Sequence, residues 1–321
     1  GIGVCMSETP GVLIVNQYFR RLRSTANGLR TAGNPLGGMV FPLLYVHLLE
    51  NFGLKGTYIM ITGIMLQICV MGCMLRPFEI HKVHIQKIYF KEMLNTQEEE
   101  SYEQLLSQNS SKIQTINEKP PIEFRFLKNP LFLFYIAMNI GLMFVIPNNL
   151  VYSTLYAQAI GLGPWEISFI LSYYSGLDFI CRLACGWLTD RNIYKKRHAF
   201  AAGLFISAIG LLLVPMCWDK WSLMGAIGLT ALGLAYYYVL IVVLLAEQFG
   251  EDSIASTYGF FQMSQGIGCF MSPPLLGLLA DSSGGLCQPF ICMGSMMLVS
   301  MVLFILQSLI AKIVGQNIVN M

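Results

Sequence analysis

The chain has 321 residues, of which 55% are hydrophobic and only 12% are charged, whereas soluble domains carry about 25% charged residues. Its net charge of +2 gives no support for a nucleic-acid partner, and its mean hydropathy of +0.58 excludes a soluble globular protein. Several apolar runs reach the ~20 residues that a helix needs to cross a bilayer. The composition therefore predicts an all-α integral membrane protein.

The apolar runs predict nine membrane-spanning helices, separated by short polar connections and by one long polar segment. The sequence defines the boundaries of these spans to within a few residues. The predicted spans are residues 1–16, 26–49, 57–76, 131–158, 164–189, 198–217, 222–246, 256–280 and 288–311.

Lysine and arginine are distributed unevenly between the two sides of these spans. If the loop after the first span is cytoplasmic, the inner connections hold sixteen basic residues and the outer ones only Lys55 and Lys220. Cytoplasmic loops of membrane proteins are enriched in basic residues. The sequence therefore predicts a cytoplasmic location for loops 17–25, 77–130 and 190–197 and for the carboxy terminus.

The first span carries one acidic residue, Glu8, about 18 Å from the basic loop at 1.5 Å per residue. One interpretation is a protonated or hydrogen-bonded carboxyl that faces a neighbouring helix. The other is a proton-carrying site, because acidic residues inside a membrane often have a functional role. The sequence leaves both open.

Residues 18–35 read Tyr-Phe-Arg-Arg-Leu-Arg-Ser-Thr-Ala-Asn-Gly-Leu-Arg-Thr-Ala-Gly-Asn-Pro. This run resembles the signature before the fifth helix of the monocarboxylate transporter family, within the major facilitator superfamily. It differs at Leu22, where the family usually has a third consecutive basic residue, and at Arg30, where a small residue is common. Small residues allow close helix packing in membranes, which is expected here at Ala26, Gly28, Ala32 and Gly33.

Two patterns recur along the chain at an offset of 231–232 residues. Residues 24–28 resemble residues 255–259, and residues 37–42 resemble residues 268–273. Such a repeat relates the fifth and eleventh helices in two six-helix halves of the superfamily fold. The resemblance then implies that the chain begins within the fourth helix, with about nine of twelve helices present.

The resemblance also implies a division into three segments. Residues 1–76 would form part of the amino-terminal bundle, helices 4–6, and residues 131–321 the carboxy-terminal six-helix bundle, helices 7–12. Residues 77–130 lack a sustained apolar period and include Gln97-Glu-Glu-Glu100. We therefore expect this segment to be a cytoplasmic, largely disordered loop.

The fourth span contains Pro147 followed by Asn148 and Asn149. Proline removes a backbone hydrogen bond and kinks a helix. The two amides either satisfy the freed backbone groups or contact substrate, and the sequence does not choose. Tyr152 and Tyr156 follow at helical spacing and are candidates for the same face, although an outer aromatic belt also explains Tyr156.

The fifth span carries Asp178 and Arg182, four residues apart and therefore on one helix face. Counted from the outer end, Asp178 lies about 21 Å deep, near the bilayer midplane, where secondary transporters bind their substrates. A self-neutralising structural ion pair is the alternative. The family resemblance implies that the arginine binds the substrate carboxylate and that the aspartate takes part in proton coupling.

The end of this span, Gly186-x-x-x-Asp190-Arg191, resembles the superfamily loop motif between helices eight and nine. It implies a gating role for Asp190 and Arg191, and the basic cluster of Arg20, Arg21 and Arg23 is assigned to the same gate. In the seventh span, Tyr236, Tyr237 and Tyr238 are candidates for the cavity wall. Of these we assign Tyr237 to substrate binding, with interior packing as the alternative.

No phosphate-binding loop, nucleophile elbow or metal-ligand spacing is present in the sequence, so neither an enzyme nor a cofactor is expected. The resemblance implies a plasma-membrane, proton-coupled symporter of lactate- or pyruvate-like monocarboxylates that works by alternating access. It also implies a single-pass ancillary glycoprotein as a partner. The alternatives are a carrier of aromatic amino acids, thyroid hormones, creatine or carnitine, and a non-transporting sensor on the same fold.

Overall fold

The computed structural model of the protein describes residues 11, 12, 14, 15, 18, 19, 22–67, 70, 129–191, 193–250 and 254–313. Side chains at 255, 283 and 311–313 are excluded from this description. The expectations for Glu8, Arg20, Arg21 and the loop at 77–128 lie outside these residues. The chain divides into two units, Gly1–Gly63 with Arg125–Met321, and Ile64–Phe124. The helices considered below belong to the first unit, except for the last two residues of the first of them, Ile64 and Met65.

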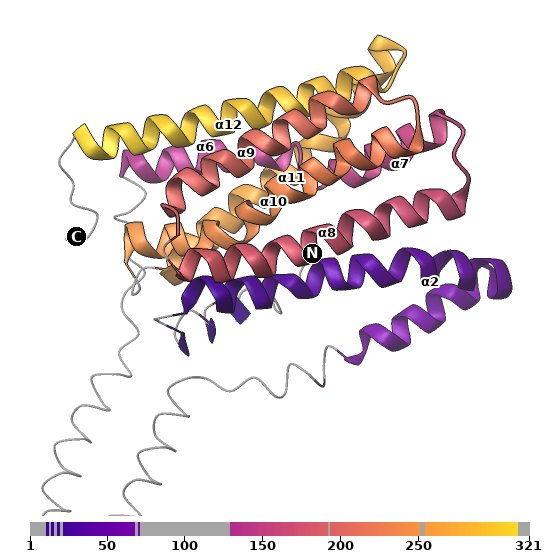
Figure 1. Ribbon diagram of the computed structural model, residues 1–321, viewed down its shortest axis with the longest axis horizontal. Coiled ribbons are helices and arrows are strands. Elements are labelled where there is room, and N and C mark those ends of the chain that lie inside the picture. The colour runs from indigo at the N-terminus through magenta and orange to yellow at the C-terminus, as the bar shows by residue number, and fades with distance from the viewer. Residues whose placement is uncertain are drawn as a thin grey trace, which may run out of the picture. The chain divides into compact units, whose positions relative to one another are not determined.

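The first long element, α2 (Arg23–Met65), covers one predicted span and reaches into the next. Its two arms meet at Gly53, whose backbone has φ 62° and ψ −177°. Residues with a Cβ avoid this region and glycine does not, so the chain can turn there within one continuous run of helix. The first arm corresponds to the span predicted at 26–49, and the second arm to the first part of the span predicted at 57–76, up to Met65 (Figure 1).

The next predicted span is divided into α6 (Pro130–Met143) and α7 (Asn148–Ala159). The Asn129 side chain caps α6 by accepting a hydrogen bond from the Leu131 N–H at 3.0 Å. The helix is interrupted over residues 144–147, directly before the two asparagines. The break expected at Pro147 is therefore present.

The remaining helices follow the predicted spans closely. The Glu166 carboxylate, in the first turn of α8, accepts a hydrogen bond from the Gly163 N–H at 3.3 Å. This bond caps the N-terminus of α8. These elements are α8 (Pro164–Asp190), α9 (Lys196–Leu213), η2 (Val214–Met216), α10 (Lys220–Phe249), α11 (Ile254–Ser283) and α12 (Cys287–Ile313).

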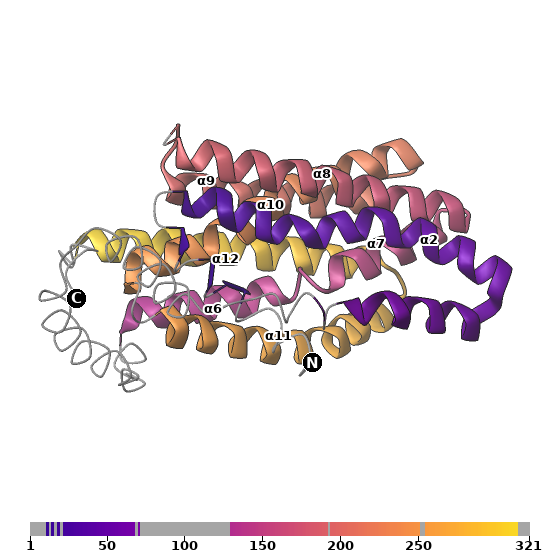
Figure 2. The same cartoon turned by 90° about the horizontal axis from the view of Figure 1, so that it is seen from below.

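Helix α10 is the most enclosed helix of the bundle and packs against α8 and α9. In turn α9 packs against α12, and α6 lies against both α11 and α12 (Figures 1 and 2). Backbones approach closely where α9 and α10 cross, because a Cβ added to Gly233 would lie only 2.2 Å from the Gly203 carbonyl oxygen. Small residues at such crossings are typical of membrane helix packing.

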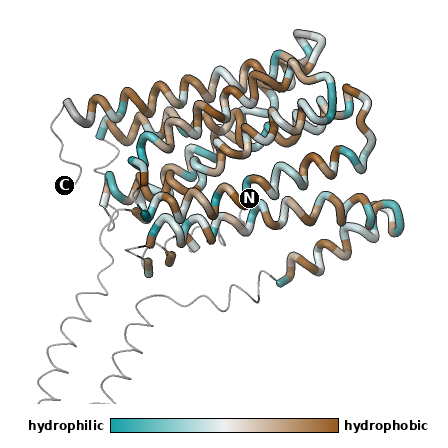
Figure 3. Tube along the Cα trace, viewed as in Figure 1, coloured by the Kyte–Doolittle hydropathy of each residue, from teal (hydrophilic) through white to brown (hydrophobic). Residues whose placement is uncertain are grey.

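Four helical stretches in the described part are long and apolar enough to cross a membrane: Pro130–Ala159, Lys196–Met216, Lys220–Phe249 and Cys287–Ile310. Apolar residues run along the helices of the bundle, and polar residues gather near several helix ends (Figure 3). The more polar α8 is also long enough to span, at 27 residues. Its polar residues include the pair described next.

Candidate functional site

Asp178 and Arg182 form a buried ion pair in the middle of α8. The Arg182 Nε donates to Asp178 Oδ1 at 2.9 Å, and Nη2 donates to Oδ2 at 2.6 Å. The two residues are only 4% and 3% exposed. The helical spacing that predicted a shared face therefore yields a two-bond, side-on contact, the strong geometry for an arginine and a carboxylate.

Two further groups hold the guanidinium from outside α8. Arg182 Nη1 donates to the backbone carbonyl of Thr31, on α2, at 2.9 Å. The Arg182 Cζ atom lies 3.9 Å from the centre of the Tyr238 ring, on α10, which is within the range of a cation–π contact. The pair is therefore the point where α2, α8 and α10 meet.

Arg182 keeps hydrogen-bonding capacity after these contacts. A guanidinium has five N–H groups, and within the described residues three of them have partners, one each on Nε, Nη1 and Nη2. One N–H on each Nη atom is left. A carboxylate has two oxygens that match such a pair of donors. These two N–H groups have no partner among the described contacts, in a residue that is only 3% exposed.

Helix α2 reaches this site because small residues face α8. A Cβ at Gly28 would lie 2.9 Å from the Arg182 carbonyl oxygen, and one at Gly186 would lie 2.8 Å from that of Ser24. Gly28 and Ala32, both expected to pack closely, are buried, whereas Gly33 is exposed. The small-residue pattern of the sequence therefore marks this contact at Gly28.

Asp190 ends α8 and contacts the start of α2. Its Oδ1 and Oδ2 accept hydrogen bonds from the backbone N–H groups of Ser24, at 3.1 Å, and Thr25, at 2.7 Å. The first N–H groups of a helix lack partners within the helix and carry partial positive charge. A carboxylate from α8 therefore caps α2, and the predicted gating residue Arg23 begins that helix.

The other predicted gating residue of this motif, Arg191, is exposed and lies over the Trp187 ring of α8, 3.9 Å from its centre. The loop that follows is fixed by Tyr194, whose hydroxyl donates to the Cys185 carbonyl at 3.3 Å. Burial raises the pKa of the Tyr194 hydroxyl, so it remains a donor at neutral pH. Asp190 therefore joins α8 to α2 together with Gly186, whose carbonyl accepts from Thr25 Oγ1 at 3.3 Å, whereas Arg191 stacks within α8.

Asn148 and Asn149 lie directly after the break between α6 and α7, and both are buried. The Asn148 amide donates to the Phe144 carbonyl at 3.1 Å and to Ser272 Oγ, on α11, at 2.8 Å. It thus satisfies a backbone group at the break and links two helices. The Asn149 Oδ1 accepts from Ser153 at 3.5 Å. These contacts support the structural interpretation for Asn148, whereas the Asn149 Nδ2 is buried without a hydrogen-bond partner in the described structure.

Tyr152 and Tyr156 share a face of α7, as their spacing predicts. Their rings pack edge-on against Phe290 of α12, at centroid distances of 6.5 and 5.7 Å. The Tyr156 hydroxyl donates to the Cys217 carbonyl at 2.9 Å. The structure does not bring either tyrosine together with Arg182 through these contacts.

Tyr237 is 1% exposed and is held between helices. Its hydroxyl donates to Asn139 Oδ1 of α6 at 3.1 Å and accepts from Gln265 Nε2 of α11 at 2.9 Å. The neighbouring Tyr238 is the tyrosine that faces Arg182. Of the three consecutive tyrosines that the sequence offers on this span, the rotation of α10 places Tyr238 beside Arg182 and Tyr237 between helices.

Within the described ranges, no group of three or more histidine, cysteine or acidic residues is placed to hold a metal ion. The site therefore consists of the ion pair, the Thr31 carbonyl and the Tyr238 ring. Its chemistry is that of a fixed cation beside a titratable carboxylate, which suits the binding of an anion together with a proton.

Comparison with known proteins adds a family match. The sequence model described as the Major Facilitator Superfamily matches residues 1–193 and 134–312. The chain is 26% identical over 309 residues to a Mus musculus protein named monocarboxylate transporter 2, covering 94% of this chain and 61% of the mouse protein. It is 24% identical over 315 residues to the Homo sapiens protein named monocarboxylate transporter 12, covering 94% of this chain and 60% of the human protein. The chain thus spans about three fifths of the length of these relatives.

The fold is also similar to solved structures. One is the transporter FucP of the same superfamily in its outward conformation, with a TM-score of 0.56, 13% identity, and coverage of 92% of this chain and 71% of FucP. A variant of the E. coli fucose:proton symporter FucP matches with a TM-score of 0.52 and 14% identity, covering 95% of this chain and 90% of the symporter. At such identity the likeness concerns the fold alone.

Proposed function

The chain belongs to the Major Facilitator Superfamily, and we propose that the protein is a secondary active transporter. It carries a small monocarboxylate across the membrane together with a proton. The observation that carries the proposal is Arg182, a buried cation with one uncommitted N–H on each Nη atom among the described contacts. The relatives named monocarboxylate transporters support the substrate class. The protein is a multi-pass membrane protein, and we place it in the plasma membrane.

In the proposed mechanism, Arg182 supplies a fixed positive charge and up to two parallel hydrogen bonds to the substrate carboxylate. Asp178 occupies the Nε–Nη2 edge of the guanidinium. An ionised Asp178 neutralises the cation and repels the incoming anion. When Asp178 is protonated it no longer neutralises Arg182, and the guanidinium can pair with the substrate anion. Proton binding and substrate binding therefore strengthen each other at one site.

Substrate access requires movement at the contact between α2 and α8, because Arg182 is buried beneath it. We propose that residues 1–76 and 131–321 belong to two bundles that rock about the substrate site, as in alternating access. In the proposed orientation, Asp190 with Ser24 and Thr25 forms the inner gate. At the opposite end of α8, the Trp165 indole N–H donates to Glu50 of α2 at 3.0 Å.

Replacing Asp190 by asparagine is expected to weaken the inner gate. An amide keeps one of the two bonds to α2 and loses the negative charge at the helix start. The loss of one charge-assisted bond and of the dipole interaction amounts to about 1.4 kcal/mol, a tenfold shift toward the open state. The measurement is the rate at which a membrane-impermeant maleimide labels a Thr31→Cys reporter from the cytoplasmic side, expected to rise about tenfold.

The matched control for this gate is Arg191→Gln, one residue along. Arg191 lies over Trp187 within α8, so its loss should leave the labelling rate of the reporter unchanged. Protein without the Thr31→Cys substitution corrects for labelling of native cysteines. An unchanged rate in Asp190→Asn, or an equal rise in Arg191→Gln, would contradict the assignment of Asp190 to the gate.

The transport proposal is tested by uptake into cells that express the full natural protein. Labelled lactate and pyruvate are compared with an aromatic amino acid, a thyroid hormone, creatine and carnitine, each with and without an inward proton gradient. We expect saturable uptake of lactate or pyruvate that rises with the gradient. Uptake of only another solute would overturn the substrate class, and uptake indifferent to the gradient would overturn proton coupling.

A further inference from the structure

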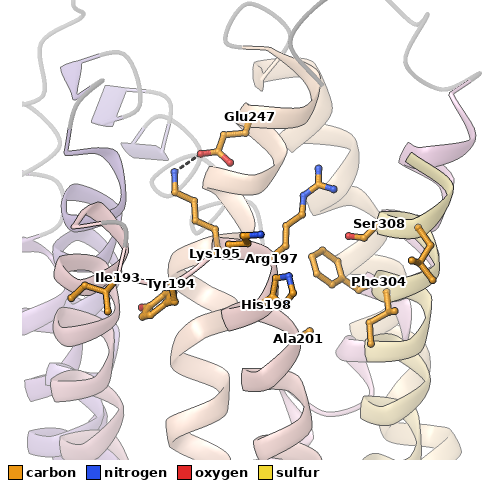
Figure 4. Close-up of a pocket in the computed structure, with 12 residues that line it drawn as sticks. Ile193, Tyr194, Lys195, Arg197, His198, Ala201, Glu247, Phe304 and Ser308 are labelled. Carbon is orange, nitrogen blue, oxygen red and sulfur yellow. Dashed lines mark hydrogen bonds and ion pairs between the residues drawn. The ribbon is translucent and has the colours of Figure 1, made fainter. Parts of the chain in front are cut away.

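A cavity of about 890 Å³ lies at the end of the bundle where α9 begins, away from the Asp178–Arg182 pair. Its walls come from the loop before α9, the first turns of α9, the end of α10 and the last turns of α12 (Figure 4). The cavity thus lies at the ends of α9 and α12, two helices that are long and apolar enough to span a membrane.

One wall of the cavity is strongly basic. Lys195, Lys196 and Arg197 are consecutive at the start of α9, and the only carboxylate among the lining residues is Glu247. Glu247 pairs with Lys196. In the part of the chain that the structure describes, no hydrogen bond or ion pair engages the Lys195 or Arg197 side chain. The cavity therefore has two cations in excess.

The opposite wall is apolar and belongs to α12. Phe304 is buried behind the cavity, while Ile305 and Leu309 are 40% and 49% exposed on the outer side of the same helix. In Figure 4, Arg197 extends from the first turn of α9 on the side where α12 carries Phe304 and Ser308, and Lys195 lies just before that helix. The apolar wall is thus continuous with a helix face that is exposed in the protein and would lie against lipid.

Ser308 provides a second, independent sign of a ligand. Its Oγ atom is shielded from solvent, lines the cavity and has no hydrogen-bond partner in the described structure. A buried hydroxyl without a partner costs free energy, and a polar ligand group in the cavity would satisfy it. At the start of α9 the Lys195 side chain does not cap the helix, so the first backbone N–H groups of α9 gain no partner from it.

We propose that this cavity binds the headgroup of an anionic phospholipid. The phosphate lies between Lys195 and Arg197 near the start of α9, within reach of the Ser308 hydroxyl, and an acyl chain follows Ile305 and Leu309 along α12. A soluble phosphate would use the basic wall but not the apolar one, whereas a phospholipid uses both. Basic pockets between membrane helices on the cytoplasmic side bind such headgroups.

The proposal adds a lipid site to the transporter and is independent of the substrate site. None of the residues that line the cavity contacts Asp178 or Arg182 through the hydrogen bonds described above. On the orientation proposed above, the site faces the cytoplasmic leaflet, which carries the anionic lipids. Binding can be measured without transport, so its failure is distinguishable from a failure of the transport proposal.

The test is lipid binding to the purified full natural protein by native mass spectrometry, with phosphatidylinositol 4,5-bisphosphate compared with phosphatidylcholine. We expect tight binding of the anionic lipid only. The Lys195→Gln/Arg197→Gln double variant should bind it roughly 25-fold more weakly, since each cation near a membrane surface contributes about 1 kcal/mol. The matched control is Lys55→Gln/Lys220→Gln, which removes two cations from elsewhere and should bind as the unmodified protein does.

Two further arms separate the lipid from its soluble headgroup. Leu309→Gln should weaken binding of the whole lipid, and free inositol trisphosphate should compete only weakly, because it lacks acyl chains. Equal affinity for the two lipids, or an equal loss in the control variant, would overturn the site. Competition by the soluble phosphate at the affinity of the whole lipid would overturn the lipid as its ligand.

Discussion

Replacing Arg182 by lysine is expected to weaken binding of a labelled monocarboxylate about 100-fold, since losing hydrogen bonds to a charged group costs ~2.7 kcal/mol. Lysine keeps the charge but not the planar fork. In the protein that fork holds Asp178 along one edge, donates to the Thr31 carbonyl and stacks on Tyr238. An ammonium cannot make all these contacts and also offer two parallel donors to a carboxylate.

Two controls separate lost binding from lost folding in this experiment. Tyr238→Phe keeps the ring over Arg182, so it should bind substrate within about threefold of the unmodified protein. The neutral double variant Asp178→Asn/Arg182→Gln removes both charges together, which is often tolerated in a buried pair. It should keep its thermal unfolding temperature in detergent but bind no substrate. Normal binding by Arg182→Lys would mean that the pair has only a structural role.

Much of the fold follows from local sequence. The apolar runs predicted the helices that the structure describes from α2 to α12, and Pro147 predicted the break between α6 and α7. The spacing of four residues predicted that Asp178 and Arg182 share a face, because helix geometry alone fixes that relation. Each of these predictions depends on residues within a few turns of one another.

The contacts that complete the site could not be obtained in this way. The Thr31 carbonyl that accepts from Arg182 lies 151 residues earlier in the chain, and Ser24 lies 166 residues from Asp190. Composition and periodicity carry no information about which helices meet at that distance. Tyr237 and Tyr238 differ by about 100° around α10, so the identity of the tyrosine beside Arg182 depends on how that helix is rotated by its packing.

Replacing Asp178 by asparagine is expected to abolish the pH dependence of substrate binding while preserving the binding itself. Asparagine resembles a protonated aspartic acid, because its amide oxygen accepts a hydrogen bond and its amide nitrogen donates one. It can accept from only one of Nε and Nη2, and both donate to Asp178 in the protein. The second N–H and the full charge of Arg182 then become available to the substrate at every pH.

In the unmodified protein, binding one proton with each anion makes the dissociation constant rise about tenfold per pH unit once Asp178 is ionised. The Asp178→Asn variant should give a flat profile at the affinity that the unmodified protein reaches at low pH. Binding of labelled substrate, measured across pH on both proteins, tests whether Asp178 is the proton-coupling residue. A variant that keeps the full slope would remove Asp178 from proton coupling and leave Glu8 as the remaining candidate. A variant that loses binding at all pH values would mean that the ionised carboxylate is needed to hold Arg182 in place.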